Sequence, residues 1–413
     1  MMLFLYRFKN TLFLSFLICI SCGNSGKKDA DTSQVSAEET LLEEPEPIIV
    51  AANRTDAYLP LLAGKSVGIV ANQTSVIFKE NGYTHLVDSL LQLNVDIKKV
   101  FSPEHGFRGK ADAGEKVESG TDEETGLPIV SLYGKNRKPS AELLAGLDVV
   151  LFDIQDVGTR FYTYIATLQL IMEACAENTI PVLVLDRPNP NAHYVDGPTM
   201  QKEHTGFLGM NEIPLVYGMS IGEYANMINE EGWLEGGRKC DLRVIPLENW
   251  THERIYQIPI RPSPNLPNDV SINLYPSLGL FEGTNVNAGR GTEFQFQRYG
   301  ASFMDSTAYS FSYVPEPNFG SKYPKEEGKK CYGKDLSNTP RINEVSLQWI
   351  LDAYKNTLDK SKFFLTDGFT KHAGTPVLQK QIESGLTEAE IKASWQPELE
   401  KFKKIRAKYL MYE

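Results

Sequence analysis

The sequence predicts an α/β fold, in which a Rossmann-like parallel sheet domain is followed by a smaller α+β domain. Short apolar runs alternate with stretches of helical periodicity between residues 65 and 190. The run 148–154 (DVVLFDI) is almost continuously apolar, which is typical of a parallel strand covered on both faces. Repeated strand–helix alternation of this kind indicates an open parallel sheet with right-handed crossovers.

Each element follows from its own pattern. Strands are predicted at 66–71, 95–101, 127–132, 148–154 and 181–185, because each is a short apolar run bounded by polar residues, glycine or proline. Helices are predicted at 83–93, 141–147 and 164–177, where apolar residues recur at helical spacing.

The pattern changes after about residue 262. The segment 261–268 (RPSPNLPN) is punctuated by proline, as a domain junction or a binding loop often is. Extended aromatic segments and helical patterns near 343–358, 387–393 and 399–409 follow it. We therefore place the sheet domain at 52–264 and the smaller domain at 265–413.

The amino-terminal segment has the features of a lipoprotein signal. Arg7 and Lys9 precede a short apolar stretch at 11–20, and Ser21 precedes Cys22. We predict a lipoprotein signal peptide over 1–21 and a lipid on Cys22, with an ordinary cleaved signal as the alternative. Residues 22–51 then read as a disordered acidic linker. The expected location is extracytoplasmic, anchored to a membrane, in the periplasm of a Gram-negative bacterium.

Charge and cysteine content exclude several classes of partner. The net charge of −11 argues against nucleic acid. The three cysteines that follow Cys22 in the chain, Cys175, Cys240 and Cys331, lie far apart and form no metal-binding spacing, so we predict no structural zinc. No glycine fingerprint follows the first strand, and we expect no cofactor. A metal site built from His105 with Asp153, Asp156 or Asp186 is a minority alternative, and the oligomeric state stays open.

Polar side chains follow the predicted strands at the points where the strands end. Glu104 and His105 lie in the segment 102–106 (SPEHG), while Asn72, Gln155 with Asp156, and 186–190 (DRPNP) follow the other strands. Because the carboxyl ends of parallel strands meet at one edge of a sheet, these loops are expected to form one ligand crevice. An acid beside a base in such a loop suggests proton transfer.

One further motif has two interpretations. The segment 218–222 (GMSIG) matches the nucleophile turn of serine hydrolases, but Ser220 with Glu223 also forms a helix capping box. We favour the cap and keep a serine esterase using Ser220 as an alternative function.

Four long blocks resemble one known family. These are FSPEHGFRG (101–109), VVLFDIQDVGTRFYTYIATL (149–168), VLDRPNP (184–190) and LFEGTNVNAGRGTEFQF (280–296). They resemble the NamZ family of exo-β-N-acetylmuramidases, and the resemblance runs from about residue 60 to the end of the chain. It implies a cleft between the two domains, release of N-acetylmuramic acid from the non-reducing end of peptidoglycan fragments, and a role in cell-wall recycling. A glycan-binding or solute-binding lipoprotein without catalysis is the main alternative.

Glycoside cleavage usually needs two carboxyl groups that flank the bond. Glu104 is our candidate general acid, with His105 beside it, and Asp156 or Glu282 is the candidate base. Alternatively, Tyr162 or Tyr164 acts as a nucleophile. The candidate substrate-binding residues are Asn72, Gln155, Arg160, Tyr164, Arg187, Asn189, Asn285 and Arg290. Among these, Arg160 or Arg290 is expected to bind the lactyl carboxylate of the sugar.

Overall fold

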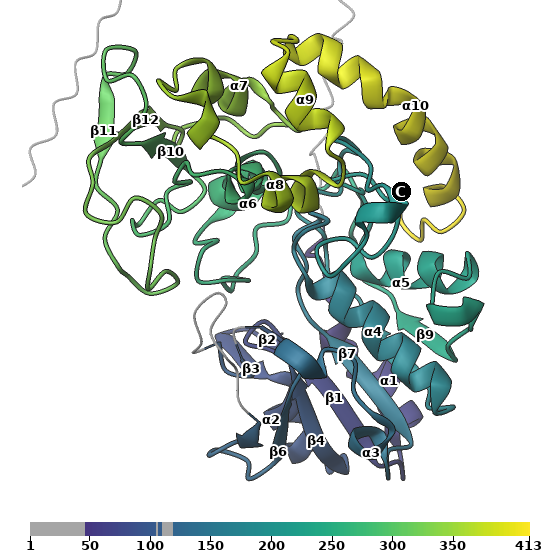
Figure 1. The fold of residues 1–413 in the computed structure, drawn as a ribbon. Helices are drawn as coiled ribbons and strands as arrows, with labels where there is room; N and C mark the ends of the chain where they lie inside the picture. Colours follow the sequence, from purple (N-terminus) through teal and green to yellow (C-terminus); the bar gives the residue numbers. More distant parts are fainter. Residues whose placement is uncertain (1–45, 105, 110–118) are drawn as a thin grey trace, which may run out of the picture. The chain divides into compact units, whose positions relative to one another are not determined.

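The structure, a computed structural model, describes residues 46–104, 106–109 and 119–413 (Figure 1). Its largest sheet has seven strands in the order β5-β6-β4-β1-β7-β8-β9, and β5 alone runs antiparallel to its neighbour. The bounds are β1 Val67–Ala71, β4 Ile97–Ser102, β5 Gly120–Thr121, β6 Pro128–Ser131, β7 Val149–Asp153, β8 Val182–Leu185 and β9 Leu242–Ile245. The six parallel strands have the Rossmann order, whose direction reverses between β1 and β7. The predicted α/β class is confirmed.

Alternate residues of the central strands face opposite sides of this sheet. Val70 is in register with Phe101 and Phe152, and these three pack with helix α4 (Tyr164–Glu177). The next layer, Ile69 with Val100 and Leu151, packs on the other side with α1 (Thr55–Leu62) and α2 (Leu86–Gln92). Burial on both faces explains why these strands read as continuous apolar runs.

Some of the observed elements differ from the predicted ones. The predicted helix 83–93 begins only at Leu86, because β3 (Gly82–His85) pairs with β2 (Val76–Lys79) in a hairpin. Strand β9 was not predicted, since its four residues are mostly half-buried or exposed and β8 supplies the pairing. Helix α4 has the predicted bounds.

The carboxyl-terminal half contains a smaller antiparallel sheet and several helices. Its strands are β10 (Arg298–Ala301), β11 (Phe311–Tyr313) and β12 (Cys331–Asp335), in the order β10-β12-β11. The helices are α6 (Asp269–Leu278), α7 (Gln348–Lys355), α8 (Thr366–Ala373), α9 (Val377–Glu383) and α10 (Glu388–Arg406). Helix α10 joins the two segments that the sequence separated. Because residues 46–413 form one compact unit, the boundary at residue 264 stays a prediction.

The last residues of the predicted linker, 46–51, are part of the folded structure. Ile49 pairs with Glu248, and Val50 and Ala51 are buried. These apolar residues pack on the sheet domain, so 46–51 belong to the folded part. The predicted signal peptide, its Cys22 and most of the linker lie outside the described residues. Within the described part, no helix is both long and apolar enough to cross a bilayer.

Candidate active site

A pocket of about 150 Å³ lies beyond the carboxyl ends of the parallel strands and is also lined by segments of the second half. It brings together five of the residues that the sequence singled out: Glu104, Tyr162, Tyr164, Glu282 and Arg290. Residues from both halves of the described chain therefore share one small polar cavity.

Glu104 is held at the end of β4 by a tight turn. The amide of Gly106 donates to the carbonyl of Pro103 (3.1 Å), and the positive φ of Gly106 (80°) suits glycine. The carbonyl of Glu104 also accepts a long hydrogen bond from the Tyr164 hydroxyl (3.5 Å). His105 lies outside the described residues, so its role stays a prediction.

Glu282 faces the same pocket from the short helix Gly279–Gly283 and is flanked by cations. Its carboxylate lies 3.3 Å from Nη2 of Arg290. The ammonium of Lys325 donates to the carbonyls of Phe281, Glu282 and Thr284 (2.6–3.0 Å). Burial disfavours the charged form of Glu282, but Arg290 and Lys325 outweigh it and lower the pKa of this carboxyl below its usual value. Glu282 is therefore ionised at neutral pH.

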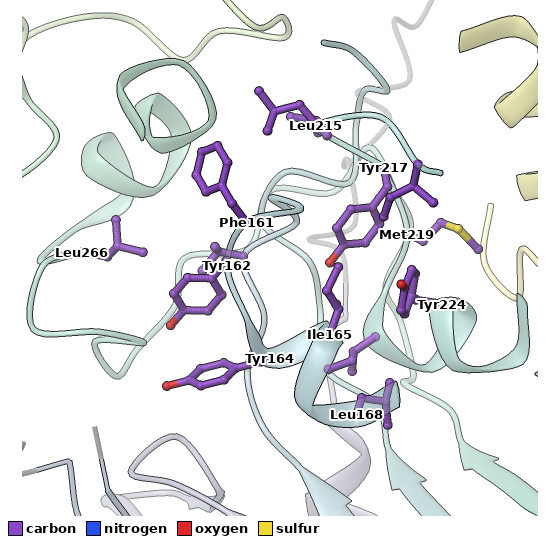
Figure 2. Close-up of a cluster of buried hydrophobic side chains, with 14 of the residues drawn as sticks. Phe161, Tyr162, Tyr164, Ile165, Leu168, Leu215, Tyr217, Met219, Tyr224 and Leu266 are labelled. Carbon is purple, nitrogen blue, oxygen red and sulfur yellow. The ribbon is translucent and has the colours of Figure 1, made fainter. Parts of the chain in front are cut away.

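The two tyrosines extend from the start of α4 in the same direction (Figure 2). Burial raises the pKa of both phenols, and the charge of Glu104 adds to the effect at Tyr164. The Tyr162 hydroxyl already donates to the carbonyl of Pro262 (2.7 Å). Since neither phenol ionises readily, the geometry does not favour a tyrosine nucleophile.

Arg160 does not line the pocket, although the sequence suggested it as a substrate-binding residue. Its guanidinium is fully buried and donates to the carbonyls of Pro198, Ile213 and His372 (2.7–3.0 Å). The side chain ties three distant segments together, so a contact of its guanidinium with a substrate carboxylate is not supported.

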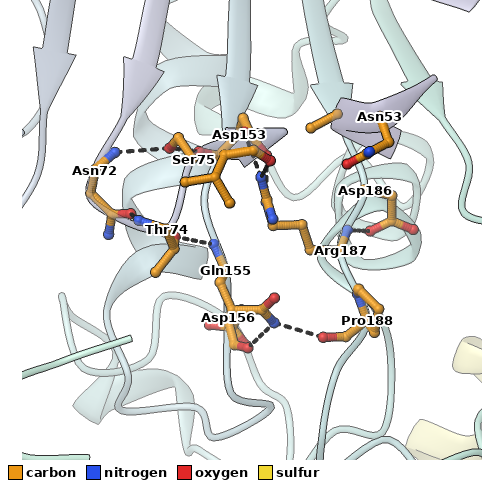
Figure 3. Close-up of polar contacts among 12 residues, drawn as sticks. Asn53, Asn72, Thr74, Ser75, Asp153, Gln155, Asp156, Asp186, Arg187 and Pro188 are labelled. Atoms are coloured by element: carbon orange, nitrogen blue, oxygen red, sulfur yellow. Dashed lines mark hydrogen bonds and ion pairs between the residues drawn. The ribbon is translucent and has the colours of Figure 1, made fainter. Parts of the chain in front are cut away.

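Most polar residues at the strand ends are buried and make polar contacts with neighbouring loops (Figure 3). Arg187 pairs with Asp153 (2.8 Å between Nη2 and Oδ2). The Gln155 amide donates to the carbonyl of Pro188 (2.6 Å), and that of Asn189 donates to the carbonyl of Met219 (2.8 Å). These contacts hold the loops in place, and Gln155, Arg187 and Asn189 do not line the pocket, so their role in substrate binding stays a prediction.

Asn72 belongs to the same layer but differs in one respect. Its side-chain oxygen accepts from the amide of Thr74 (2.8 Å), which shapes the turn after β1. Its side chain also lies beside the hydroxyl of Tyr164, and this contact partly offsets the rise in the pKa of that phenol. Asn72 does not line the pocket, so a direct contact with substrate is not supported.

Two other candidates lie away from the pocket. Asp156 is 3% exposed, accepts from the hydroxyl of Tyr217 and the amide of Gly158, and does not line the cavity. Burial raises its pKa to about 7. The amide of Asn285 donates to the carbonyl of Lys362 (2.7 Å). Neither position fits the role predicted for it, and Glu282 remains as the second carboxyl group.

Ser220 is the N-cap of helix α5 (Ile221–Glu230), as the capping-box interpretation predicted. Its hydroxyl is fully buried and donates to Asp186 (2.7 Å). His252 contacts Glu223 (2.9 Å). A buried serine that serves as a helix cap does not fit the role of an esterase nucleophile.

Sequence reasoning missed several residues that line or support the pocket. Asn265 belongs to the proline-rich segment that the sequence marked as a junction or binding loop. Tyr275 and His372 line the pocket from α6 and α8, and no local motif announced them. Across residues 46–104, 106–109 and 119–413, no group of three or more His, Cys, Asp or Glu could hold a metal ion.

A Rossmann-type sheet and a pocket with two carboxyl groups together define a class, that of α/β proteins with a site suited to glycoside hydrolysis. The N-terminal domain of the exo-β-N-acetylmuramidase NamZ matches residues 67–270, and its C-terminal domain matches residues 273–412. The chain belongs to the NamZ family of glycosidases.

Individual relatives agree with this assignment. The peptidoglycan β-N-acetylmuramidase NamZ of Bacillus subtilis (strain 168) is 39% identical over 375 residues, which cover 86% of this chain and 89% of that protein. Crystal structures of two DUF1343 family proteins from Bacteroides fragilis NCTC 9343 are also similar. Their TM-scores are 0.81 and 0.75, with 42% and 27% identity, and both comparisons cover 89% of this chain and 99% of the other.

Proposed function

We propose that this protein removes N-acetylmuramic acid from the non-reducing end of peptidoglycan fragments during cell-wall turnover. The observation that carries the proposal is that Glu104 and Glu282, from opposite halves of the chain, line one pocket. Membership of the NamZ family supplies the reaction class, hydrolysis of an O-glycosyl bond.

Each carboxyl group has a distinct part in this proposal. Glu104 donates a proton to the glycosidic oxygen as the bond to the anomeric carbon breaks. Glu282, kept ionised by Arg290 and Lys325, takes a proton from the water that attacks that carbon. The products are free N-acetylmuramic acid and a shortened glycan.

Arg290 is the residue that we propose to recognise the lactyl carboxylate. Its guanidinium faces the pocket, and its buried Nε has no hydrogen-bond partner in the described part of the chain. A planar guanidinium with spare donors suits a carboxylate, and N-acetylglucosamine lacks that group. Tyr162 and Tyr164, as neutral phenols, offer hydrogen bonds and a flat surface to the sugar ring.

A chromogenic substrate tests the proposed activity directly. The wild-type protein should release para-nitrophenol from para-nitrophenyl β-N-acetylmuramide, and should release free sugar from a disaccharide that has N-acetylmuramic acid at its non-reducing end. Glu282→Gln should lose most turnover, whereas Glu80→Gln, an exposed glutamate in the β2–β3 hairpin, serves as the matched control. Binding without release at any pH would instead favour a glycan-binding protein without catalysis.

We also propose that Cys22 carries a lipid that anchors the protein outside the cytoplasm, in the periplasm of a Gram-negative bacterium. The support is the charged, apolar and Ser-Cys pattern of residues 1–22. Cells fed a labelled fatty acid should incorporate label into the wild-type protein but not into Cys22→Ala. Equal labelling of both proteins would refute the anchor.

A further inference from the structure

A second cavity, of about 550 Å³, is larger than the active-site pocket and shares no lining residue with it. Helices α9 and α10, which lie beside each other in Figure 1, form one wall. The segment 198–201, together with Glu212 and Trp233, forms the other wall. A volume of this size is within the range of small-molecule sites, about 300–1,000 Å³.

Three aromatic residues are among those that line this cavity. Trp233, Trp395 and Phe402 all line it. The indole N–H of Trp395 donates to Asp196 (3.2 Å), which fixes the orientation of the ring. Trp395 and Phe402 are 6% and 2% exposed, whereas Trp233 is half-buried. A pyranose ring exposes C–H bonds on its faces and hydroxyl groups at its edge, so the indole of Trp233 is the ring that offers it a flat surface.

The cavity also contains polar groups that a sugar would satisfy. Oγ1 of Thr199 is buried and has no hydrogen-bond partner among the described residues. A buried hydroxyl without a hydrogen-bond partner is energetically unfavourable, and a hydroxyl or acetamido group of a ligand would form the missing hydrogen bond. The amides of Gln201 and Gln381 line the same space.

The charges around the cavity disfavour an anionic ligand. Among the described residues that line it, Lys401 is the one cation, and it pairs with Glu398 (2.6 Å). Glu212 makes no ion pair within the described chain. Because negative charge is in excess, a sugar that carries a lactyl carboxylate is repelled, whereas an uncharged sugar is not.

We propose that this second cavity binds uncharged N-acetylglucosamine units of a glycan. It would be a second glycan-binding site, separate from the catalytic pocket. The choice of peptidoglycan as the source rests on the proposed function. The preference for an uncharged amino sugar rests on the walls of the cavity alone.

The test is a titration with N,N′-diacetylchitobiose, followed by tryptophan fluorescence and by calorimetry. N-acetylmuramic acid is present at saturation, so that the catalytic pocket is filled. We expect saturable binding that is weakened at least about tenfold in Trp233→Ala, a change equal to about 1.4 kcal/mol. Ser394→Tyr, which adds a ring to an exposed position of α10 at the cavity, should abolish binding. Tyr83→Ala removes an exposed aromatic ring outside the cavity and should bind normally.

Three results would overturn the proposal. These are no binding by the wild-type protein, equal binding by both cavity variants, and loss of binding when N-acetylmuramic acid is added. Circular dichroism checks that the variants are folded. Hydrolysis of the chromogenic muramide is measured in parallel, and its absence would refute the proposed function while leaving the chitobiose result to decide this inference.

Discussion

Replacing Asp156 with asparagine tests whether this residue affects the stability of the fold or acts as the catalytic base that the sequence suggested. The native state keeps a proton on this buried carboxyl up to about pH 7, whereas the ordinary pKa is 3.8. Between these values the folded protein binds more protons than the unfolded chain, so stability falls as pH rises. The difference corresponds to about 4 kcal/mol at pH 7 and above. Asp156→Asn mimics the protonated form and should lose this dependence.

The assay is urea denaturation of wild-type and variant proteins between pH 4 and 8. The wild-type protein should lose stability relative to Asp156→Asn across this range, while hydrolysis of the muramide stays within about threefold. Asp241→Asn, at an exposed position, is the control and should follow the wild-type curve. The reasoning is refuted if Asp156→Asn loses turnover by a hundredfold or more with an unchanged pH profile of stability, because Asp156 would then be catalytic.

Three further predictions test other contacts. Arg290→Gln should raise KM for muramides about tenfold to a hundredfold, because a charge-assisted contact with the substrate is lost. The acidic limb of the pH profile of kcat/KM should also move to higher pH, because Glu282 loses a cation that lowers its pKa. A KM within twofold of wild type would contradict this. Asp153→Asn should cost about 3–5 kcal/mol in urea denaturation, because it leaves Arg187 buried without its partner; a loss below 1 kcal/mol would show that the pair is dispensable. Ser220→Ala should cost about 1 kcal/mol as a lost helix cap and keep full turnover, whereas inactivity would revive the esterase.

The elements that local pattern determines were predictable from the sequence. Helix α4 and the central strands follow from apolar periodicity, and the capping box at Ser220 follows from the spacing of two residues. The turn that holds Glu104 follows from a proline and a glycine next to a strand end. Each of these signals lies within a few residues of the feature that it specifies.

Features that depend on distant segments were not predictable. Arg160 lies in a stretch that suggests a substrate-binding arginine. Its buried guanidinium instead donates hydrogen bonds to carbonyls that are about 40, 50 and 210 residues away along the chain. Arg187 at a strand end could equally have faced a ligand, and only its pairing with Asp153 decides the matter. Glu282 and His372 line the same pocket as Glu104, although they are far from it along the chain. The sequence therefore identified the edge of the sheet at which the pocket lies. It did not show which polar side chains there would be bonded to other parts of the protein and which would face the pocket.

The central claim is that Glu104 protonates the leaving group, and the most direct measurement compares two substrates in Glu104→Gln. One substrate is a disaccharide, whose sugar leaving group is poor. The other is a dinitrophenyl N-acetylmuramide, whose dinitrophenolate leaving group departs without protonation. We predict that kcat falls about 10²–10⁴-fold for the disaccharide and far less for the dinitrophenyl glycoside. Equal losses for both substrates, or near-normal turnover of the disaccharide, would contradict the account.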